Sequence, residues 1–173
     1  MGIEEDQKLI VTISRIYKGK PFEFWVKQIK DFLIENKNFV YLLAGFDDTE
    51  HSKTVESSLK KLGLNGNIRT HKFTSPVETN EIFNAADFSL WFAPTISIQQ
   101  SMATGLFAIM PFDSTLDHLM EKNSAGFYYN NFDELKNYLS ELKGVSYERK
   151  KNSEINQKFS YRNILQKVIS ELN

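Results

Sequence analysis

The segment from Ala86 to Phe112 constrains the fold more than any other part of the chain. Residues 87–93 are mostly apolar and have the length of a strand that is buried on both faces of a sheet. Pro94 ends this strand, a short helix follows, and Gly105 is the residue type that most easily closes a helix. Residues 106–110 are apolar again and form the next strand. This order predicts a right-handed strand–helix–strand unit with parallel strands.

The start of this short helix is the best candidate for a binding site. Ser97 lies three residues before Gln100, which is the spacing of a capping box and predicts a helix that starts at Ser97. Ligands of open α/β sheets bind beyond the carboxyl ends of the strands, and residues 94–97 lie at that end. Two interpretations of Gln100 stay open, because its amide could cap the helix or contact the hydroxyls of a ligand lying over the helix.

The rest of the chain alternates between strand-like and helix-like segments in the same way. Ser75 with Pro76 opens one further helix, and Ser114 with Asp117 has the spacing of a second capping box. This alternation predicts a single α/β domain, Rossmann-like, with a doubly wound parallel sheet of about six strands. The domain spans residues 9–173, and residues 1–8 are a lead-in or the remnant of a linker. The further predicted strands are residues 9–14, 39–44, 68–73 and 126–129.

Composition excludes several classes of function. The chain has 173 residues, of which 41% are hydrophobic, enough to bury a core of ordinary size. A formal net charge of −1 argues against a nucleic-acid surface or a polybasic membrane patch. The sequence has no cysteine, which excludes disulfides and thiolate chemistry. With no long apolar span and no signal peptide, we expect a cytoplasmic protein.

Motifs of common catalytic and phosphate-binding sites are missing from the sequence. It contains no G-x-S-x-G, no G-x-G-x-x-G and no P-loop pattern, which argues against a hydrolase elbow, a dinucleotide site and a kinase-type site. Asp47 and Asp48 lack a third cluster of oxygen ligands, so we expect solvated turn residues and no metal site.

Two cations follow the first predicted strand. Arg15 and Lys20 lie just past its carboxyl end, on the same edge of the sheet as residues 94–97. A guanidinium and an ammonium opposite the free N–H groups of a helix N-terminus would make a site for a phosphate or diphosphate. The alternative is that both side chains face water, because surface lysine and arginine are the norm.

The order of these features resembles the C-terminal, nucleotide-sugar-binding domain of the GT-B glycosyltransferases, specifically the retaining family 4. The resemblance covers most of the chain. That family has a strand followed by an arginine and then a lysine, a strand that closes on glycine, and a signature helix that ends in glycine. The corresponding segments here are ISRIYKGK, VYLLAGFDD, EIFNAADFSLWFAP, QSMATG, DSTLDHLMEKNSAGFYY and FSYRNILQKVISEL.

The resemblance implies a role for each matching residue. Arg15 and Lys20 would be the catalytic cations that hold the donor diphosphate, with Lys18 as a rival for the lysine role. Backbone amides at the signature helix would contact phosphate or sugar, Gln100 would hold the ribose, and residues 71–74 would border the base. The implied substrate-binding residues are Gly45, His71, Phe73, Thr74, Thr95, Ile96, Ser97, Ile98 and Gln100.

The resemblance also implies a function. The donor would be a UDP-sugar or GDP-sugar, no metal would be required, and the acceptor would bind an N-terminal domain that this chain lacks. The helix at residues 157–172 would pack towards that domain, and a peripheral association of the parent enzyme with a membrane stays open. Glutamine replaces the family's glutamate at Gln100, and residues 94–97 carry no counterpart of its first glutamate. The alternatives are a non-catalytic nucleotide- or sugar-binding module on the same fold and, third, a flavodoxin-like signalling domain.

Overall fold

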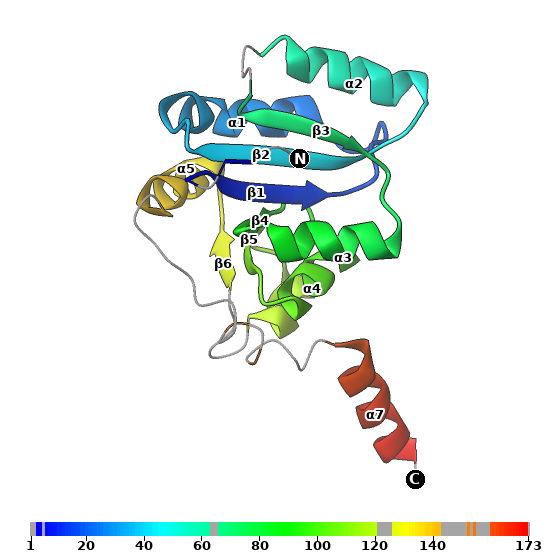
Figure 1. Cartoon of the computed structure of the whole chain (residues 1–173). Helices are drawn as coiled ribbons and strands as arrows, with labels where there is room; N and C mark the ends of the chain where they lie inside the picture. Colours follow the sequence, from blue (N-terminus) through cyan, green and yellow to red (C-terminus); the bar gives the residue numbers. More distant parts are fainter. Residues whose placement is uncertain are drawn as a thin grey trace.

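A parallel six-stranded sheet lies between two layers of helices in the computed structural model (Figure 1). The structure describes residues 3–4, 6–62, 66–120, 126–142, 152, 154 and 160–172. All the paired strands run parallel, in the order β3-β2-β1-β4-β5-β6, which confirms the predicted doubly wound sheet. The strands are β1 (Lys8–Ile13), β2 (Phe39–Phe46), β3 (Ile68–Lys72), β4 (Phe88–Leu90), β5 (Phe107–Pro111) and β6 (Gly126–Tyr129).

The order of the strands fixes where a ligand can enter. β1 pairs with β2 on one side and with β4 on the other, so the direction in which the sheet grows reverses at β1. Connections on the two sides of such a reversal lead to opposite faces and leave a crevice outside the carboxyl ends of the strands. Residues 14–20, which follow β1, and residues 91–95, which follow β4, therefore border this crevice.

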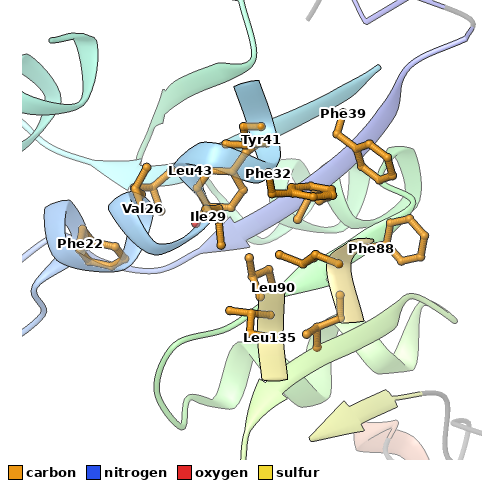
Figure 2. Close-up of a cluster of buried hydrophobic side chains, with 14 of the residues drawn as sticks. Phe22, Val26, Ile29, Phe32, Phe39, Tyr41, Leu43, Phe88, Leu90 and Leu135 are labelled. Atoms are coloured by element: carbon orange, nitrogen blue, oxygen red, sulfur yellow. The ribbon is translucent and has the colours of Figure 1, made fainter. Parts of the chain in front are cut away.

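The helices divide between the two faces of the sheet. One layer of helices packs its apolar residues on one face, and Figure 2 shows Phe22, Val26 and Ile29 of the first helix against sheet residues such as Tyr41 and Leu90. The other face is covered by helices that carry Ile82, Phe83 and Met102 among other buried residues. The first layer is α1 (Phe22–Glu35), α2 (Glu50–Lys60) and α5 (Phe132–Glu141), and the second is α3 (Pro76–Ala85), α4 (Ile96–Ala103) and the 3-10 helix η1 (Ser114–Leu119).

The C-terminal helix α7 (Tyr161–Leu172) lies outside these two layers (Figure 1). Its exposed side chains include Leu165, Val168 and Ile169, which follow helical spacing. The structure thus has the amphipathic helix that the sequence predicts. Residues 157–159, its predicted start, lie outside the described residues.

The two capping boxes predicted from the sequence, at Ser97 and Ser114, are wrong. The observed N-caps lie two residues and one residue earlier. α4 begins at Ile96 after Thr95, whose extended backbone (φ −159°, ψ 149°) presents its carbonyl to the Ile98 N–H at 3.1 Å. The helix has therefore begun before Ser97, which makes no side-chain cap. At η1 the cap is Asp113, whose carboxylate accepts the Thr115 N–H at 2.9 Å.

The strand predicted at residues 87–93 is also shorter than its apolar run. β4 ends at Leu90, although the Trp91 N–H still donates to the Ile109 carbonyl at 2.8 Å. Of the apolar residues beyond Leu90, Trp91 is buried, and Phe92 is half-buried and stacks on Trp25 with ring centroids 5.3 Å apart. The apolar run therefore marks burial, and pairing ends earlier.

Candidate functional site: a pocket at the carboxyl edge of the sheet

A pocket of about 560 Å³ opens at the carboxyl ends of β1 and β2, between α3 and α4. This volume lies in the range of small-molecule sites. Arg15 and Ser97, which come from connections on different strands, both line it. The anion site predicted from the sequence can exist only if these two residues share one cavity. The structure places both residues in the same cavity.

Arg15 supplies the positive charge of the pocket. Its side chain is exposed, and the guanidinium carbon lies 5.8 Å from the centre of the Phe73 ring. Such a cation–π contact holds the guanidinium over the ring while its N–H groups stay available to a ligand. Phe73 follows β3 and is itself 61% exposed, so the two side chains form one wall of the opening.

Gly45 lets the backbone of β2 approach that of β1 at the base of the pocket. Its φ of +123° is unfavourable for residues with a side chain, and the register of β2 with β3 shifts between Ala44 and Phe46. A Cβ on Gly45 would lie 2.1 Å from the Ser14 carbonyl oxygen. Glycine is therefore required where β1 ends, directly before Arg15.

The first turns of α4 form the opposite wall. Ser97 and Gln100 line the pocket, and within the described residues neither side chain serves as a helix cap. The Ile98 side chain is fully buried in the core, and its N–H is taken up by the Thr95 carbonyl. The amides of Ile96 and Ser97 stand at the helix N-terminus, where backbone N–H groups lack helical acceptors.

Buried hydroxyls fasten α4 to the sheet. The Trp91 indole N–H donates to Ser89 Oγ at 2.9 Å, and the Ser89 and Ser101 hydroxyls lie 3.1 Å apart. Ser101 in turn donates to the Ile98 carbonyl at 2.8 Å. All three side chains are buried, so this chain of hydrogen bonds fixes the height of the first turns of α4 above β4.

Lys20 lies beside the pocket and not within its lining. Its ammonium donates to the Ser14 hydroxyl, and both residues line a small cleft that also includes Thr95. Burial lowers the pKa of Lys20 from its usual value of 10.5. Ser14 lines both cavities, so its side chain separates the Lys20 ammonium from the pocket that Arg15 lines. The rival Lys18 is exposed on the same loop.

The predicted base-binding residues divide between two cavities. Thr74 is buried and lines the pocket, with its hydroxyl 2.7 Å from that of Thr79. His71 instead lines a second cavity, of about 530 Å³, together with Asp47 and other charged residues. Phe73 lines both. The pocket therefore joins Arg15, Gly45, Phe73, Thr74, Ser97 and Gln100, while Lys20, His71 and Thr95 lie in neighbouring cavities.

Sequence reasoning missed the contribution of α3. Thr79, Asn80 and Phe83 line the pocket, and they follow Pro76 at the spacing of one helix face. That spacing is visible in the sequence once Ser75 is known to cap the helix. Gln99 was also missed, and its amide lies 3.0 Å from Nε2 of His118.

Within the described part of the chain, no group of three histidine, aspartate or glutamate residues could hold a metal ion. The same residues include no helix that is long and apolar enough to cross a membrane.

The sequence from residue 1 to residue 158 matches the family described as glycosyl transferases group 1. The chain belongs to this glycosyltransferase family. Its match extends over all the strands and over the segments that line the pocket, apart from Ser160. A comparison with curated proteins found no match.

Several solved structures share this fold. The Anabaena protein HepE in complex with UDP and glucose matches with a TM-score of 0.73 and 17% identity, over 96% of this chain and 48% of that one. The pneumococcal O-GlcNAc transferase GtfA in complex with UDP and GlcNAc has a TM-score of 0.70 and 14% identity, over 98% and 36%. Sucrose-phosphate synthase from Thermosynechococcus elongatus has a TM-score of 0.69 and 13% identity, over 92% and 41%. The chain thus spans about half of the length of these proteins or less.

Proposed function

We propose that this chain is the C-terminal, donor-binding domain of a retaining, family 4 type glycosyltransferase. The parent enzyme would transfer a sugar from a nucleotide-diphosphate sugar to a hydroxyl acceptor, in the biosynthesis of a polysaccharide or glycoconjugate in the cytoplasm. Membership of the glycosyltransferase family supports the reaction class. The neighbours crystallised with UDP and a sugar support the class of donor.

One observation carries the proposal, namely the pocket that Arg15 shares with the N-terminal turn of α4. The guanidinium can pair with a phosphate through two parallel N–H groups, and the helix N-terminus adds amide donors and the positive end of its dipole. A diphosphate between them would be neutralised on both sides. Ser97 and Gln100 would then contact the sugar or ribose hydroxyls along α4.

The same cations would serve the chemistry. In glycosyl transfer the bond to the diphosphate breaks through an oxocarbenium-like transition state, so negative charge grows on the leaving group. Arg15 would stabilise this charge directly. Lys20 would act from behind Ser14, to whose hydroxyl its ammonium donates. With cations holding the leaving group, we expect that transfer requires no metal.

The proposal includes a second domain in the parent enzyme. The structures with this fold are roughly twice as long as the chain or longer, and the acceptor would bind to the additional N-terminal domain. The apolar residues Leu165 and Val168 on α7 would pack towards it. We therefore propose that this chain alone binds donor weakly and transfers no sugar.

The alternative function is a nucleotide- or sugar-binding module without catalysis. Gln100 favours it, because a neutral amide binds ribose hydroxyls more weakly than the carboxylate of the family pattern. The two functions differ in transfer, while both require nucleotide binding.

Calorimetry with UDP and GDP tests nucleotide binding. We expect saturable binding that weakens at least about tenfold in Arg15→Ala, because a charge-assisted pair contributes about 1.5–3 kcal/mol. Lys27→Ala on α1 removes an exposed charge from the other face of the sheet and should leave binding unchanged. Sugar transfer by the chain joined to an acceptor-binding domain would support the enzyme, and binding without transfer would support the module.

A further inference from the structure

The strands β1 and β4 part beyond the end of their backbone pairing. Their register ends at the pair of Val11 with Ser89, although β1 continues to Ile13. Beyond that pair, the Trp91 N–H donates to the Ile109 carbonyl of β5. The crevice of the sheet opens at this point, because β1 leads on to one half of the proposed site and β4 leads to the other.

Two buried hydroxyls take up the carbonyls at the end of β4. Thr12 of β1 donates to the Leu90 carbonyl, and Tyr129 of β6 donates to the Trp91 carbonyl at 2.7 Å. Tyr41 of β2 donates to the Thr12 hydroxyl at 2.8 Å, which leaves the Thr12 proton for Leu90. Burial raises the pKa of both tyrosines, so both hydroxyls keep their protons and act as donors. Side chains from three other strands therefore hold the end of β4.

These hydrogen bonds lie close to both halves of the proposed site. Residues 91–95 connect the two carbonyls to the first turn of α4. On the other side, Ser14 follows β1 and leads directly to Arg15. Thr12, Ser14 and Thr95 line the same small cleft, whose volume is about 10 Å³, so the end of β1 and the start of α4 are closely packed there. A shift of the end of β4 relative to β1 would therefore move the amides of α4 relative to Arg15.

We propose that Thr12 and Tyr129 are positioning residues for the diphosphate. This inference rests on the proposed function, in which one diphosphate lies between Arg15 and the N-terminal turn of α4. The two hydroxyls fix the end of β4 relative to β1 and so set the gap that the diphosphate spans. Neither residue lines the pocket, so both act through the backbone that they hold. Hydrogen bonds to phosphate depend steeply on distance and angle, and a shift of α4 would weaken them.

Thr12→Val tests this role, because valine keeps the branched shape of threonine and lacks its hydroxyl. We expect UDP affinity to weaken about threefold or more, which is the size of effect that residues without ligand contact exert on binding. Thr12→Ser keeps the hydroxyl and loses a buried methyl group. It should lower the free energy of unfolding in urea, yet rescue UDP affinity to within about twofold of the native chain. A merely structural role would not separate stability from affinity in this way.

Tyr129→Phe removes the second hydroxyl and should also weaken UDP binding about threefold or more. Tyr128→Phe is the matched control, because Tyr128 precedes Tyr129 on β6 and its buried hydroxyl oxygen has no hydrogen-bond partner in the described part of the chain. This variant should bind UDP as the native chain does. Calorimetry on the whole chain, at a temperature at which circular dichroism shows every variant to be folded, measures these affinities.

Amide NMR without nucleotide gives a second readout. We expect the amide signals of Ile96 and Ser97 to move in Thr12→Val and in Tyr129→Phe, and to stay in place in Tyr128→Phe. Signals that stay in place in all three variants would show that the hydroxyls do not position α4, and would overturn the inference.

Failure of the inference and failure of the proposed function give different results. Native UDP affinity in Thr12→Val and in Tyr129→Phe would overturn the inference and leave the donor site standing. Equal weakening in Thr12→Ser and Thr12→Val would also overturn it, because the methyl group and not the hydroxyl would then matter. No UDP binding by the folded native chain would overturn the proposed function and, with it, this role of the two hydroxyls.

Discussion

At the scale of single residues, the site depends on how closely two strands approach. The Gly45 backbone lies against the Ser14 carbonyl, and this contact places Arg15 at the mouth of the pocket. The resemblance of VYLLAGFDD to the family pattern implies that Gly45 borders the site. The sequence does not reveal why glycine is needed, because Ser14 and Gly45 come together only when β1 pairs with β2.

We expect Gly45→Ala to destabilise the fold by about 3 kcal/mol or more, through backbone strain combined with the clash at Ser14. Gly66→Ala is the matched control. Gly66 also has a positive φ, of +89°, but a Cβ there meets nothing within 4 Å, so a loss of about 1 kcal/mol is expected. Urea denaturation measures both. Equal losses would show that the close approach at Gly45 adds nothing.

The lowered pKa of Lys20 makes two opposite predictions for pH. Burial disfavours the charged form, so the folded chain binds fewer protons than the unfolded chain between the lowered pKa and the usual 10.5. Through this window the free energy of unfolding contributed by Lys20 rises with pH. UDP affinity should fall over the same window, because the ammonium that attracts the diphosphate is lost.

Lys20→Arg isolates this effect, since a guanidinium stays charged throughout. We expect a flatter pH profile of UDP affinity in the variant, and comparison at each pH cancels any titration of the nucleotide itself. The measurement is calorimetry from neutral to alkaline pH. If UDP affinity changed with pH equally in the native chain and in Lys20→Arg, Lys20 would not contribute to UDP binding.

At the scale of the elements, α4 shows what periodicity can and cannot predict. The strand, the short helix and the closing Gly105 (φ +81°) follow from residue types, and the structure confirms them. The exact start of α4 does not follow, because Ser97–Gln100 has a capping spacing that the extended backbone of Thr95 pre-empts. The predicted capping box assigned the side chains of Ser97 and Gln100 to the helix itself. In the structure neither side chain caps α4, and both line the pocket.

The buried hydrogen bonds under α4 give a prediction at this scale. Ser101→Ala would remove the hydrogen bond between the buried Ser89 and Ser101 hydroxyls, while Ser89 keeps the Trp91 indole donor, so a cost of about 0.5–1.5 kcal/mol is expected. Because Ser101 also holds the Ile98 carbonyl, UDP affinity should weaken as the first turns of α4 loosen. Ser57→Ala, at an exposed position of α2, should change neither stability nor affinity. Denaturation and calorimetry on the two variants provide the comparison.

The division of residues 71–74 between two cavities was beyond sequence reasoning. The resemblance implies that the segment HKFT borders the site, and Phe73 and Thr74 of this segment line the pocket. The Phe73 ring, however, forms a partition with Thr74 on one side and His71 on the other. Which side each residue faces depends on the path of the chain after β3, and no residue type in the segment determines that path.

At the scale of the whole molecule, the alternation of strands and helices predicts the doubly wound sheet, and the crevice at β1 then locates the site. The family match covers the strands of this sheet, and the solved structures share its fold. The described part of the chain has a pocket open at the sheet edge and exposed apolar residues on α7.

The central claim is that one diphosphate lies between Arg15 and the N-terminal turn of α4. An amide NMR titration with UDP tests it most directly. We expect the largest shifts at the amides of Ile96, Ser97 and Gly45, and their disappearance in Arg15→Ala. Shifts concentrated instead at His71 and Lys53 of the second cavity, or an unchanged titration in Arg15→Ala, would contradict the claim.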